Sequence, residues 1–477
     1  MKKRIAIVGG GISGLTAAYI LQRDYAHTSE FSLFEANSRL GGIIETVHTD
    51  GFTIECGPDS WVTEKPWAEQ LARELGLARE LLPSNDRERR TYIARGSEKQ
   101  AGSLAALPDA MRMMVPTDLN AMLASPLFTE SARQAYLAEP TRAAELRETA
   151  LLNRGSDADE SVATFVRRHF GDEVVDIVAG PLLAGVFGGD IEKLSARALL
   201  APFVAIEADH GSLITGMQQH GRSSGVPLFT TVASGLGTLV DRLLRTLPPT
   251  SIRLTCPVLA IDSLPEGWVI ETADGRERFD RVLIATPLDT TRQLLISLPL
   301  IEAQRSATLL PADAASGLVV ALGYKAQSKP VPTTPKGFGL LVAASPADNH
   351  SLLACTFLHQ KFQERAPEGA ALLRAFFASS AADVLSPRSD HEIAVIARNQ
   401  LVELLGPLPE QADVTIVRRW PRSLPQYEIG HVERMEKFNI CVSTLVGIAV
   451  AGNAFRGVGL PDLVRDATRA AHTLARD

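Results

Sequence analysis

The sequence contains few cysteines, and their spacing does not suggest a cross-linked or metal-binding framework. Four occur in 477 residues, namely Cys56, Cys256, Cys355 and Cys441; they lie far apart, with no C-x-x-C spacing. The ten histidines show no H-E-x-x-H spacing. These absences argue against disulfides and against a metal site, and they favour reduced thiols in a cytoplasmic protein.

Long apolar runs and long basic runs are also missing. No stretch reaches the ~18 uninterrupted apolar residues of a membrane-spanning helix. The apolar run behind Lys2-Lys3-Arg4 has only four residues, fewer than the core of a signal peptide. Lysine and arginine number 48 against 55 acidic residues, so the net charge is −7, and we expect no nucleic-acid partner.

The N-terminal segment has the pattern of a dinucleotide-binding turn. The short apolar run Ile5–Val8 predicts a buried parallel strand, and glycines in G-x-G-x-x-G spacing follow it. The first glycine permits a tight turn, the second lets a pyrophosphate approach the backbone, and the third lets helix and strand pack closely. The candidate cofactor-binding residues here are Gly9, Gly11, Ile12, Ser13 and Gly14.

A carboxylate stands where a ribose-binding acid is expected. The second predicted strand, Phe31–Phe34, is followed directly by Glu35, about 20 residues after the fingerprint. A lone G-x-G-x-x-G is weak evidence, because glycine-rich turns are common. Strand, glycines, helix, strand and acid in this order predict a bound dinucleotide.

The residues after this strand indicate which dinucleotide. Glu35, Ala36, Arg39, Gly41 and Gly42 form E-A-x-x-R-L-G-G, which resembles the second signature of the amine-oxidase-like FAD flavoproteins. The resemblance implies that Arg39 and the two glycines approach the pyrophosphate and ribityl chain of FAD. Because no cysteine follows a Ser-Gly-Gly, we expect the FAD to be bound non-covalently.

Five later motifs resemble those of the protoporphyrinogen oxidase and coproporphyrinogen III oxidase family. They are Gly57-Pro58-Asp59-Ser60, then G-V-F-x-G-D with Leu-Ser at 185–195, G-F-G-x-L-V at 337–342, R-W-x-x-x-x-P-Q-Y-x-x-G-H at 419–431, and the glycine-rich segment 451–462. The resemblance extends from Lys3 to the last helix. It adds these expected FAD contacts: Gly57, Pro58, Asp59, Val258, Ala285, Gly452, Val458 and Gly459.

The same resemblance implies substrate-binding residues. Gly185 would present bare backbone, Phe338 an aromatic wall and Leu341 an apolar side chain to a flat ligand. Arg90 lies six residues before Gly96, the spacing of a propionate-binding arginine in relatives. Arg95, where relatives often have a small residue, could share or take over that role.

The expected fold class is α/β, or α+β overall, with three interleaved parts. A Rossmann-like FAD-binding domain takes 1–87, 206–292 and 421–477, a helical region takes 88–205, and a mixed α+β substrate domain takes 293–420. The helical region is rich in methionine (Met111, Met113, Met114 and Met122). We favour core packing for these side chains over the membrane-facing patch that the resemblance suggests.

The function implied is an oxygen-dependent FAD oxidase of haem biosynthesis. It would remove six electrons from protoporphyrinogen IX as three hydrides and produce hydrogen peroxide; coproporphyrinogen III is the alternative substrate. No catalytic side chain is expected, because flavin N5 accepts the hydride, and we interpret His431 as structural.

Two alternative functions are compatible with the same fold. They are an amine or carotenoid oxidoreductase and a non-enzymatic binder like the Rab GDP-dissociation inhibitors. Three matters stay open: the oligomeric state, contacts with haem-pathway enzymes, and peripheral contact with the inner face of a membrane.

Overall fold

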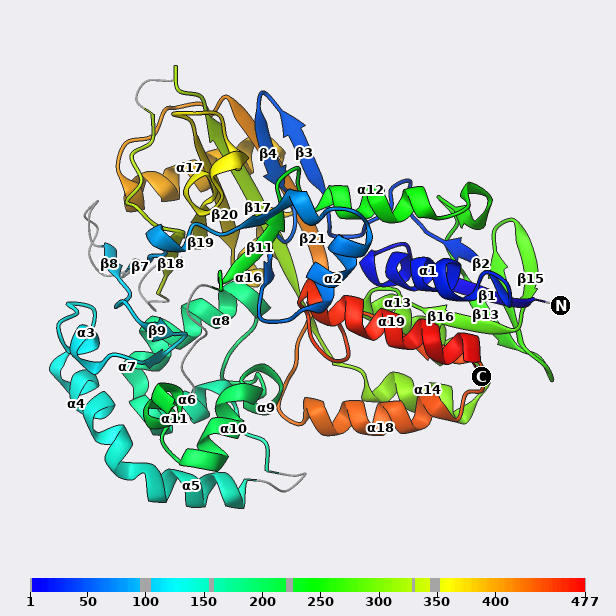
Figure 1. Cartoon of the computed structure of the whole chain (residues 1–477), viewed down its shortest axis with the longest axis horizontal. Helices are drawn as coiled ribbons and strands as arrows, with labels where there is room; N and C mark the ends of the chain where they lie inside the picture. Colours follow the sequence, from blue (N-terminus) through cyan, green and yellow to red (C-terminus); the bar gives the residue numbers. More distant parts are fainter. Residues whose placement is uncertain are drawn as a thin grey trace.

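The computed structural model describes residues 2–94, 104–153, 158–219, 226–327, 331–343 and 352–476. Figure 1 shows three parts. A sheet flanked by α1 (Ile12–Tyr25) and α19 (Leu460–Arg476) lies on the right, a larger sheet at the upper left, and a mostly helical part at the lower left.

The first part is a five-stranded parallel sheet with helices on both faces. Its strand order is β12 (Ile252–Arg253), β2 (Ser29–Phe34), β1 (Lys3–Val8), β16 (Arg281–Ile284) and β22 (Ile448–Val450). Side chains alternate along β1, so Ile5 and Ile7 pack on one face and Ala6 and Val8 on the other. The two strands predicted from the sequence are confirmed.

Each face has its own covering layer. The face of Ile5 and Ile7 is covered by α1, α2 (Trp67–Glu74), α12 (Gly237–Thr246) and α19. The other face is covered by α13 (Leu288–Ser297), α14 (Ile301–Leu309), α18 (His431–Ser443) and the meander β13 (Ala260–Ser263), β14 (Trp268–Thr272) and β15 (Gly275–Phe279). Because α13 and α14 pack here, the stretch 293–309 lies with this sheet and not with the expected substrate domain.

The strand order of this sheet also predicts where a ligand binds. After β1 the chain continues to β2 on one side of β1, whereas β22 lies beside β16 on the opposite side. Because the strand order reverses between β1 and β16, a crevice is expected at the carboxyl ends of these two strands.

Two small sheets lie beside this part. The Asp50–Gly51 pair in the sequence predicts a hairpin turn. The structure confirms it, because β3 (Thr46–Thr49) and β4 (Phe52–Glu55) pair on either side of these two residues. A three-stranded sheet joins β5 (Trp61–Val62), β11 (Phe229–Val232) and β6 (Leu81–Pro83).

The larger sheet has seven strands. Their order is β21 (Val414–Pro425), β17 (Ala314–Tyr324), β20 (Ala371–Phe377), β19 (Leu352–Phe357), β18 (Gly339–Val342), β7 (Thr91–Ala94) and β8 (Leu104–Ala106). The helices α16 (Ser379–Leu385) and α17 (Asp390–Leu405) pack against it. This sheet differs from the expected boundaries at both ends, because β7 and β8 come from the segment expected to be helical and β21 continues past residue 420.

The helical part runs from about Leu119 to Gln219, not from 88 to 205. Its helices are α3 (Leu119–Leu123), α4 (Glu130–Ala138), α5 (Ala143–Leu152), α6 (Val162–Phe170), α7 (Asp172–Val174), α8 (Gly180–Phe187), α9 (Ala196–Leu199), α10 (Ala201–His210) and α11 (Leu213–Gln219). Met111, Met114 and Met122 are buried in its core, which confirms core packing for these three. Among the described residues, no helix has the length and apolarity needed to cross a bilayer.

The sequence predicts a helix broken at Gly180–Pro181, because proline interrupts most helices, and this prediction is wrong. The π-helical turn η4 (Val175–Ala179) leads directly into α8, and Pro181 lies in the first turn of α8. A first-turn proline needs no N–H donor within the helix, and the wider π turn accommodates its ring. The helix ends at Gly188, whose φ of +69° is the left-handed conformation that favours glycine.

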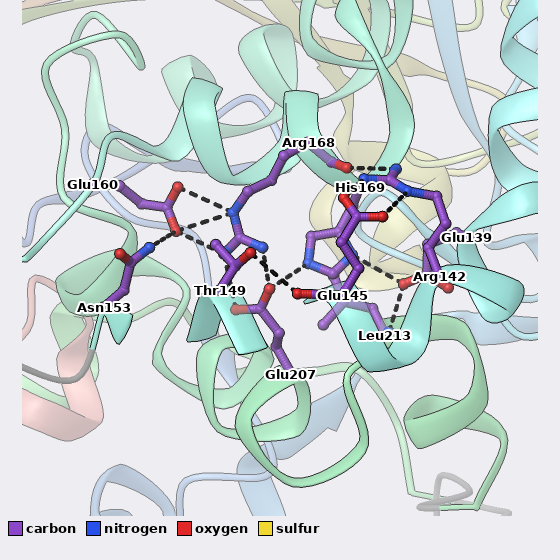
Figure 2. Close-up of polar contacts among 10 residues, drawn as sticks. All are labelled: Glu139, Arg142, Glu145, Thr149, Asn153, Glu160, Arg168, His169, Glu207 and Leu213. Atoms are coloured by element: carbon purple, nitrogen blue, oxygen red, sulfur yellow. Dashed lines mark hydrogen bonds and ion pairs between the residues drawn. The ribbon is translucent and has the colours of Figure 1, made fainter. Parts of the chain in front are cut away.

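A buried network of charged side chains connects the helices of this part (Figure 2). Arg168 lies between two carboxylates, with Nη2 2.7 Å from Glu160 Oε1 and 2.8 Å from Glu207 Oε2. The ring nitrogens of His169 lie 2.9 Å from Glu139 and 3.0 Å from Glu207. Burial opposes ionisation of Glu207, but hydrogen bonds from Arg168 and His169 hold its pKa below the usual value.

Replacing Glu207 tests this network. We expect Glu207→Gln to lower the free energy of unfolding by about 3 kcal/mol, because it leaves a buried arginine with one charged partner fewer. The folded-state pKa of Glu207 is depressed, so its stabilising contribution is complete above its unfolded pKa of about 4.3 and is lost as the pH falls through the lower folded value. The variant should therefore lose less stability than the wild type below about pH 4.3.

The measurement is chemical denaturation followed by far-UV circular dichroism across that pH range. Glu145→Gln is the matched control, because Glu145 belongs to the same group of side chains but is exposed and pairs with Arg142. A wild-type denaturation midpoint for Glu207→Gln would contradict a stabilising role for the network.

Candidate flavin and substrate site

The glycines that follow β1 have different reasons to lack a side chain. Gly9 has a φ of +107°, and a Cβ built on it would lie 2.4 Å from the carbonyl oxygen of Ala285. A Cβ on Gly14 would lie 1.9 Å from the carbonyl oxygen of Gly9. A Cβ on Gly11 would meet no protein atom within 4 Å. The protein itself therefore excludes side chains at Gly9 and Gly14, while Gly11 borders open space.

That open space lies at the N-terminus of a long helix. Gly11 is the N-cap of α1, and Ile12 and Ser13 form its buried first turn. The first N–H groups of a helix have no partner within the helix, and its dipole favours a negative charge there. The position suits a phosphate group, as the sequence predicts.

Glu35 lies at the end of β2, beside this turn, and is 8 % exposed. Its carboxylate accepts hydrogen bonds from the backbone N–H of Gly10 at 2.7 Å and of Asn37 at 2.9 Å. Ala36 follows and is exposed. The half-buried Val258 lies just after Cys256, whose N–H donates to the carbonyl of Glu35 at 2.8 Å. The structure thus brings Val258 near the predicted ribose-binding acid.

The second glycine pair adjoins the first turn. The N–H of Gly41 donates to the carbonyl of Gly10 at 2.9 Å, and a Cβ on Gly42 would lie 3.3 Å from Cα of Gly11. Arg39 donates to the carbonyls of Leu40, Gly42 and Ile44, so its guanidinium holds this loop in shape. A direct contact of Arg39 with the FAD pyrophosphate stays a prediction.

A side chain of the seven-stranded sheet and one of the neighbouring helix α15 hold the Gly57-Pro58-Asp59 segment in place. The Asp59 carboxylate lies 2.9 Å from Lys361 Nζ and 3.2 Å from Arg374 Nη1. Burial raises the pKa of Asp59, but the two cations outweigh it and hold that pKa well below the usual value. A Cβ on Gly57 would lie 2.0 Å from the carbonyl oxygen of Ile43, so this glycine is required by packing.

Sequence reasoning missed these cations. Arg374 is 1 % exposed within the otherwise apolar strand β20, and Lys361 is 7 % exposed at the end of α15 (Leu358–Lys361). A single arginine inside an apolar strand is a usable signal, because a charge in such a position needs a buried partner. The sequence does not identify Asp59 as that partner, because the two residues lie far apart in the chain.

The last predicted cofactor residues lie at the carboxyl ends of β16 and β22. Ala285 follows β16 and donates its N–H to the carbonyl of Val8 at 2.8 Å. After β22 comes a loop with Gly452, whose φ is +141°, and with Val458 and Gly459, all half-buried. The loop leads into the N-terminus of α19, so it faces the same crevice as the loop after β1.

His431, which we interpret from the sequence as structural, lies in the interior of the protein. It is 2 % exposed, its Nε2 lies 3.1 Å from the carbonyl oxygen of Phe455, and its ring stacks on Tyr427. Burial lowers the pKa of His431 to about 4, which keeps the imidazole neutral near pH 7. A neutral imidazole can donate one ring N–H to that carbonyl.

The four predicted substrate residues form two pairs, one of which lies where the helical part meets the large sheet. The N–H of Phe338 donates to the carbonyl of Arg90 at 2.8 Å, and β7 and β18 then run parallel. The Cδ2 atom of Leu341 on β18 lies 3.7 Å from a Cβ built on Gly185 of α8. Arg90 and Gly185 are exposed, whereas Phe338 is 8 % exposed. Arg95, the alternative to Arg90, lies outside the described residues.

Comparison with known proteins identifies the family. Residues 12–475 match the family model described as flavin containing amine oxidoreductase. The chain belongs to this family. Coproporphyrinogen III oxidase of Bacillus subtilis is 31% identical over 97% of this chain and 96% of that protein. The mitochondrial protoporphyrinogen oxidase of Nicotiana tabacum is 28% identical, with 96% and 92% covered.

Solved structures agree with this assignment. A protein from Exiguobacterium sp. 255-15, provisionally assigned as a protoporphyrinogen oxidase, has 32% identity and a TM-score of 0.83, with 100% of this chain and 99% of that chain covered. Putrescine oxidase, at 18% identity and a TM-score of 0.68, shares the fold. The chain is therefore a flavin-dependent oxidoreductase. The open space at Gly11, the adjoining Gly41–Gly42 and the loop after β22 fit FAD along the crevice.

Gly11→Val tests the cofactor assignment. We expect the variant to be purified with little FAD, because a valine side chain would occupy the space that the pyrophosphate needs. Its apoprotein should melt at the temperature of wild-type apoprotein, because a Cβ at Gly11 meets no protein atom within 4 Å. Glu35→Ala should weaken FAD binding by about tenfold or more through loss of a charged acceptor.

The measurements are flavin absorbance per protein and the melting temperature of the deflavinated protein. Gly14→Val is the control for a fold defect, because its Cβ would collide with the Gly9 carbonyl even without FAD. Normal flavin content in Gly11→Val would show that FAD does not pass this turn.

Proposed function

We propose that this flavoenzyme oxidises a porphyrinogen to the corresponding porphyrin in haem biosynthesis, with oxygen as the final acceptor. Relatives that match over almost the whole chain support this, since they are coproporphyrinogen III oxidases and protoporphyrinogen oxidases. Two bacterial coproporphyrinogen III oxidases are 31% and 28% identical, against 28% and 25% for the protoporphyrinogen oxidases of Nicotiana tabacum and Arabidopsis thaliana. Coproporphyrinogen III is therefore our first candidate, and protoporphyrinogen IX, the first expectation from the sequence, is the second.

The observation that carries the proposal is the meeting of α8 with β18. It brings Leu341 against the exposed Gly185, while the largely buried Phe338 precedes β18 and bonds through its N–H to the carbonyl of the exposed Arg90. A porphyrinogen is a broad apolar ring with carboxylates at its edge. Bare backbone and apolar side chains suit the ring, and a cation at the rim suits a carboxylate.

Arg90 is not the only exposed cation among the described residues of the segments that carry Arg90 and Phe338, which form the edge, or rim, of the proposed substrate site. Arg87 is exposed in η2 (Asp86–Glu88), and Lys336 is exposed just before the G-F-G segment, with Nζ 3.4 Å from Glu88. Coproporphyrinogen III carries four carboxylates and protoporphyrinogen IX two. A rim with several cations favours the substrate with more carboxylates.

The chemistry divides between cofactor and protein. FAD supplies hydride acceptance at flavin N5 and reoxidation by oxygen, with one hydrogen peroxide formed for each of the three hydrides removed. The protein's residues hold the ring in one orientation and keep water from its face. In this proposal Phe338 and Leu341 form apolar walls, and Arg90 fixes one edge by a charge-assisted hydrogen bond.

The amine oxidase alternative has less support from the residues. An amine substrate calls for an aromatic cage, and Tyr427 is the one tyrosine after residue 330 in the sequence. Its hydroxyl is engaged by backbone groups of Asn453 and Gly457. The likeness to putrescine oxidase concerns the fold alone.

A parallel assay tests the proposal. Purified holoenzyme is given coproporphyrinogen III, protoporphyrinogen IX and putrescine in air, and porphyrin fluorescence and hydrogen peroxide are recorded. We expect porphyrin formation from coproporphyrinogen III with a higher kcat/KM than from protoporphyrinogen IX, and no peroxide from putrescine. Peroxide from putrescine alone would contradict the proposal.

Arg90→Ala tests the rim contact. If Arg90 binds a carboxylate equally in the ground and transition states, KM should rise and kcat should stay nearly unchanged. The loss of one charged hydrogen-bonding partner corresponds to roughly a ten- to hundredfold rise in KM. Arg79→Ala is the control, because Arg79 is an exposed arginine of η1 (Ala78–Glu80) with no part in the proposed substrate contact, and it should leave KM unchanged. An unchanged KM in Arg90→Ala with a raised KM in Arg95→Ala would move the contact to Arg95.

A further inference from the structure

The six residues Gln426–His431 lie where the three parts of the molecule meet. They connect β21 of the large sheet to α18, and in Figure 1 this connection passes between the helical part and α19. Gln426 Nε2 donates to the carbonyl of Phe187 at 3.0 Å, at the end of α8. The N–H of Ser195 donates to the carbonyl of Tyr427 at 2.8 Å. The segment is thereby anchored to the helical part.

The other side of this segment holds the loop after β22. The Tyr427 hydroxyl donates to the carbonyl oxygen of Asn453 at 2.6 Å and accepts from the N–H of Gly457 at 3.0 Å. Its ring is 4 % exposed and stacks on His431, with ring centres 3.8 Å apart and planes 10° apart. His431 Nε2 in turn bonds the carbonyl of Phe455. The side chains of Tyr427 and His431 thus hold three backbone groups of the loop after β22, namely the carbonyls of Asn453 and Phe455 and the N–H of Gly457.

The loop they fix borders the cofactor crevice. It follows β22, which is parallel to β16, and ligands of such sheets bind beyond the carboxyl ends of the strands. Gly452 and Gly457 have φ values of +141° and +130°, so the loop presents bare backbone in conformations that side chains rarely adopt. Beyond it, α19 begins at Leu460, and the carbonyl of Gly459 at the end of the loop accepts from the N–H of Asp462 at 2.9 Å.

We infer that Tyr427 is a positioning residue for the flavin. By bonding both Asn453 and Gly457, its hydroxyl fixes the orientation of the peptide groups that lead into α19. Peptide dipoles and helix N-terminal N–H groups near a flavin set its electronic properties, so their orientation matters to the cofactor. This inference concerns FAD and does not depend on which porphyrinogen is oxidised.

Tyr427→Phe tests the inference, because it keeps the ring and its stacking on His431 and removes only the hydroxyl oxygen. Deflavinated protein is titrated with FAD, and the visible spectrum and reduction potential of the bound flavin are measured. We expect the dissociation constant for FAD to rise about tenfold. We also expect the flavin bands and the potential to shift.

Tyr136→Phe is the matched control. Tyr136 is also buried, and its hydroxyl donates to the carbonyl of Met114 at 3.0 Å inside the helical part. It should lower the melting temperature without changing FAD affinity or potential. Wild-type FAD affinity and potential in Tyr427→Phe would overturn the inference, as would equal FAD defects in both variants.

A second variant covers the case in which Tyr427→Phe does not fold. His431→Phe keeps a stacked ring and removes the hydrogen bond to Phe455. The same direction of change in FAD affinity and potential is expected. Wild-type values in this variant would overturn the inference.

Discussion

The site depends on backbone packed directly against backbone at the carboxyl end of β1. At Gly9 and Gly14 the neighbouring carbonyl groups leave no room for a Cβ, and the Gly41–Gly42 loop closes over the same turn. These contacts bring strand, helix and loop together while leaving space at Gly11 alone. A cofactor with a pyrophosphate can therefore lie against peptide N–H groups at the start of α1, with no side chain between them.

The orientation of the large sheet relative to this crevice depends on buried charges. Arg365 pairs with Glu55 at 3.0 Å, while Lys361 and Arg374 pair with Asp59. Buried ion pairs add little net stability, but a member left without its partner is costly. The two parts therefore fit together in the arrangement that pairs every one of these charges. The large sheet also carries β18, which meets α8 where the substrate is proposed to bind.

Sequence patterns predicted the parts of the fold that depend on neighbouring residues. The glycine turn, Glu35 and the hairpin at Asp50–Gly51 are local features, and the structure has them where they were expected. The pairing of β7 with β18 and the partner of Arg374 depend on residues more than 200 positions away, and no local pattern encodes them. Pro181 misled the prediction because a helix can begin at a proline as well as end before one.

The sequence likewise predicted some parts of the candidate site and missed others. The expected FAD residues that follow β1, β2, β16 and β22 lie at the carboxyl ends of one parallel sheet, because each belongs to a strand end or to a glycine-rich loop with its own signature. The motif at 419–431 was noted from the sequence, but the role of Tyr427 became visible only through its contacts with Asn453 and Gly457. The Tyr427 hydroxyl contacts backbone groups, which almost every residue has, so the residue types of its partners do not reveal these contacts.

The most direct test of the proposed function is anaerobic mixing of the holoenzyme with coproporphyrinogen III, with the absorbance of the bound flavin recorded. We predict that the flavin absorbance is lost as porphyrin absorbance appears. Admitting oxygen should then restore the oxidised flavin and produce hydrogen peroxide. A flavin that stays oxidised with both coproporphyrinogen III and protoporphyrinogen IX would contradict porphyrinogen oxidation by this enzyme.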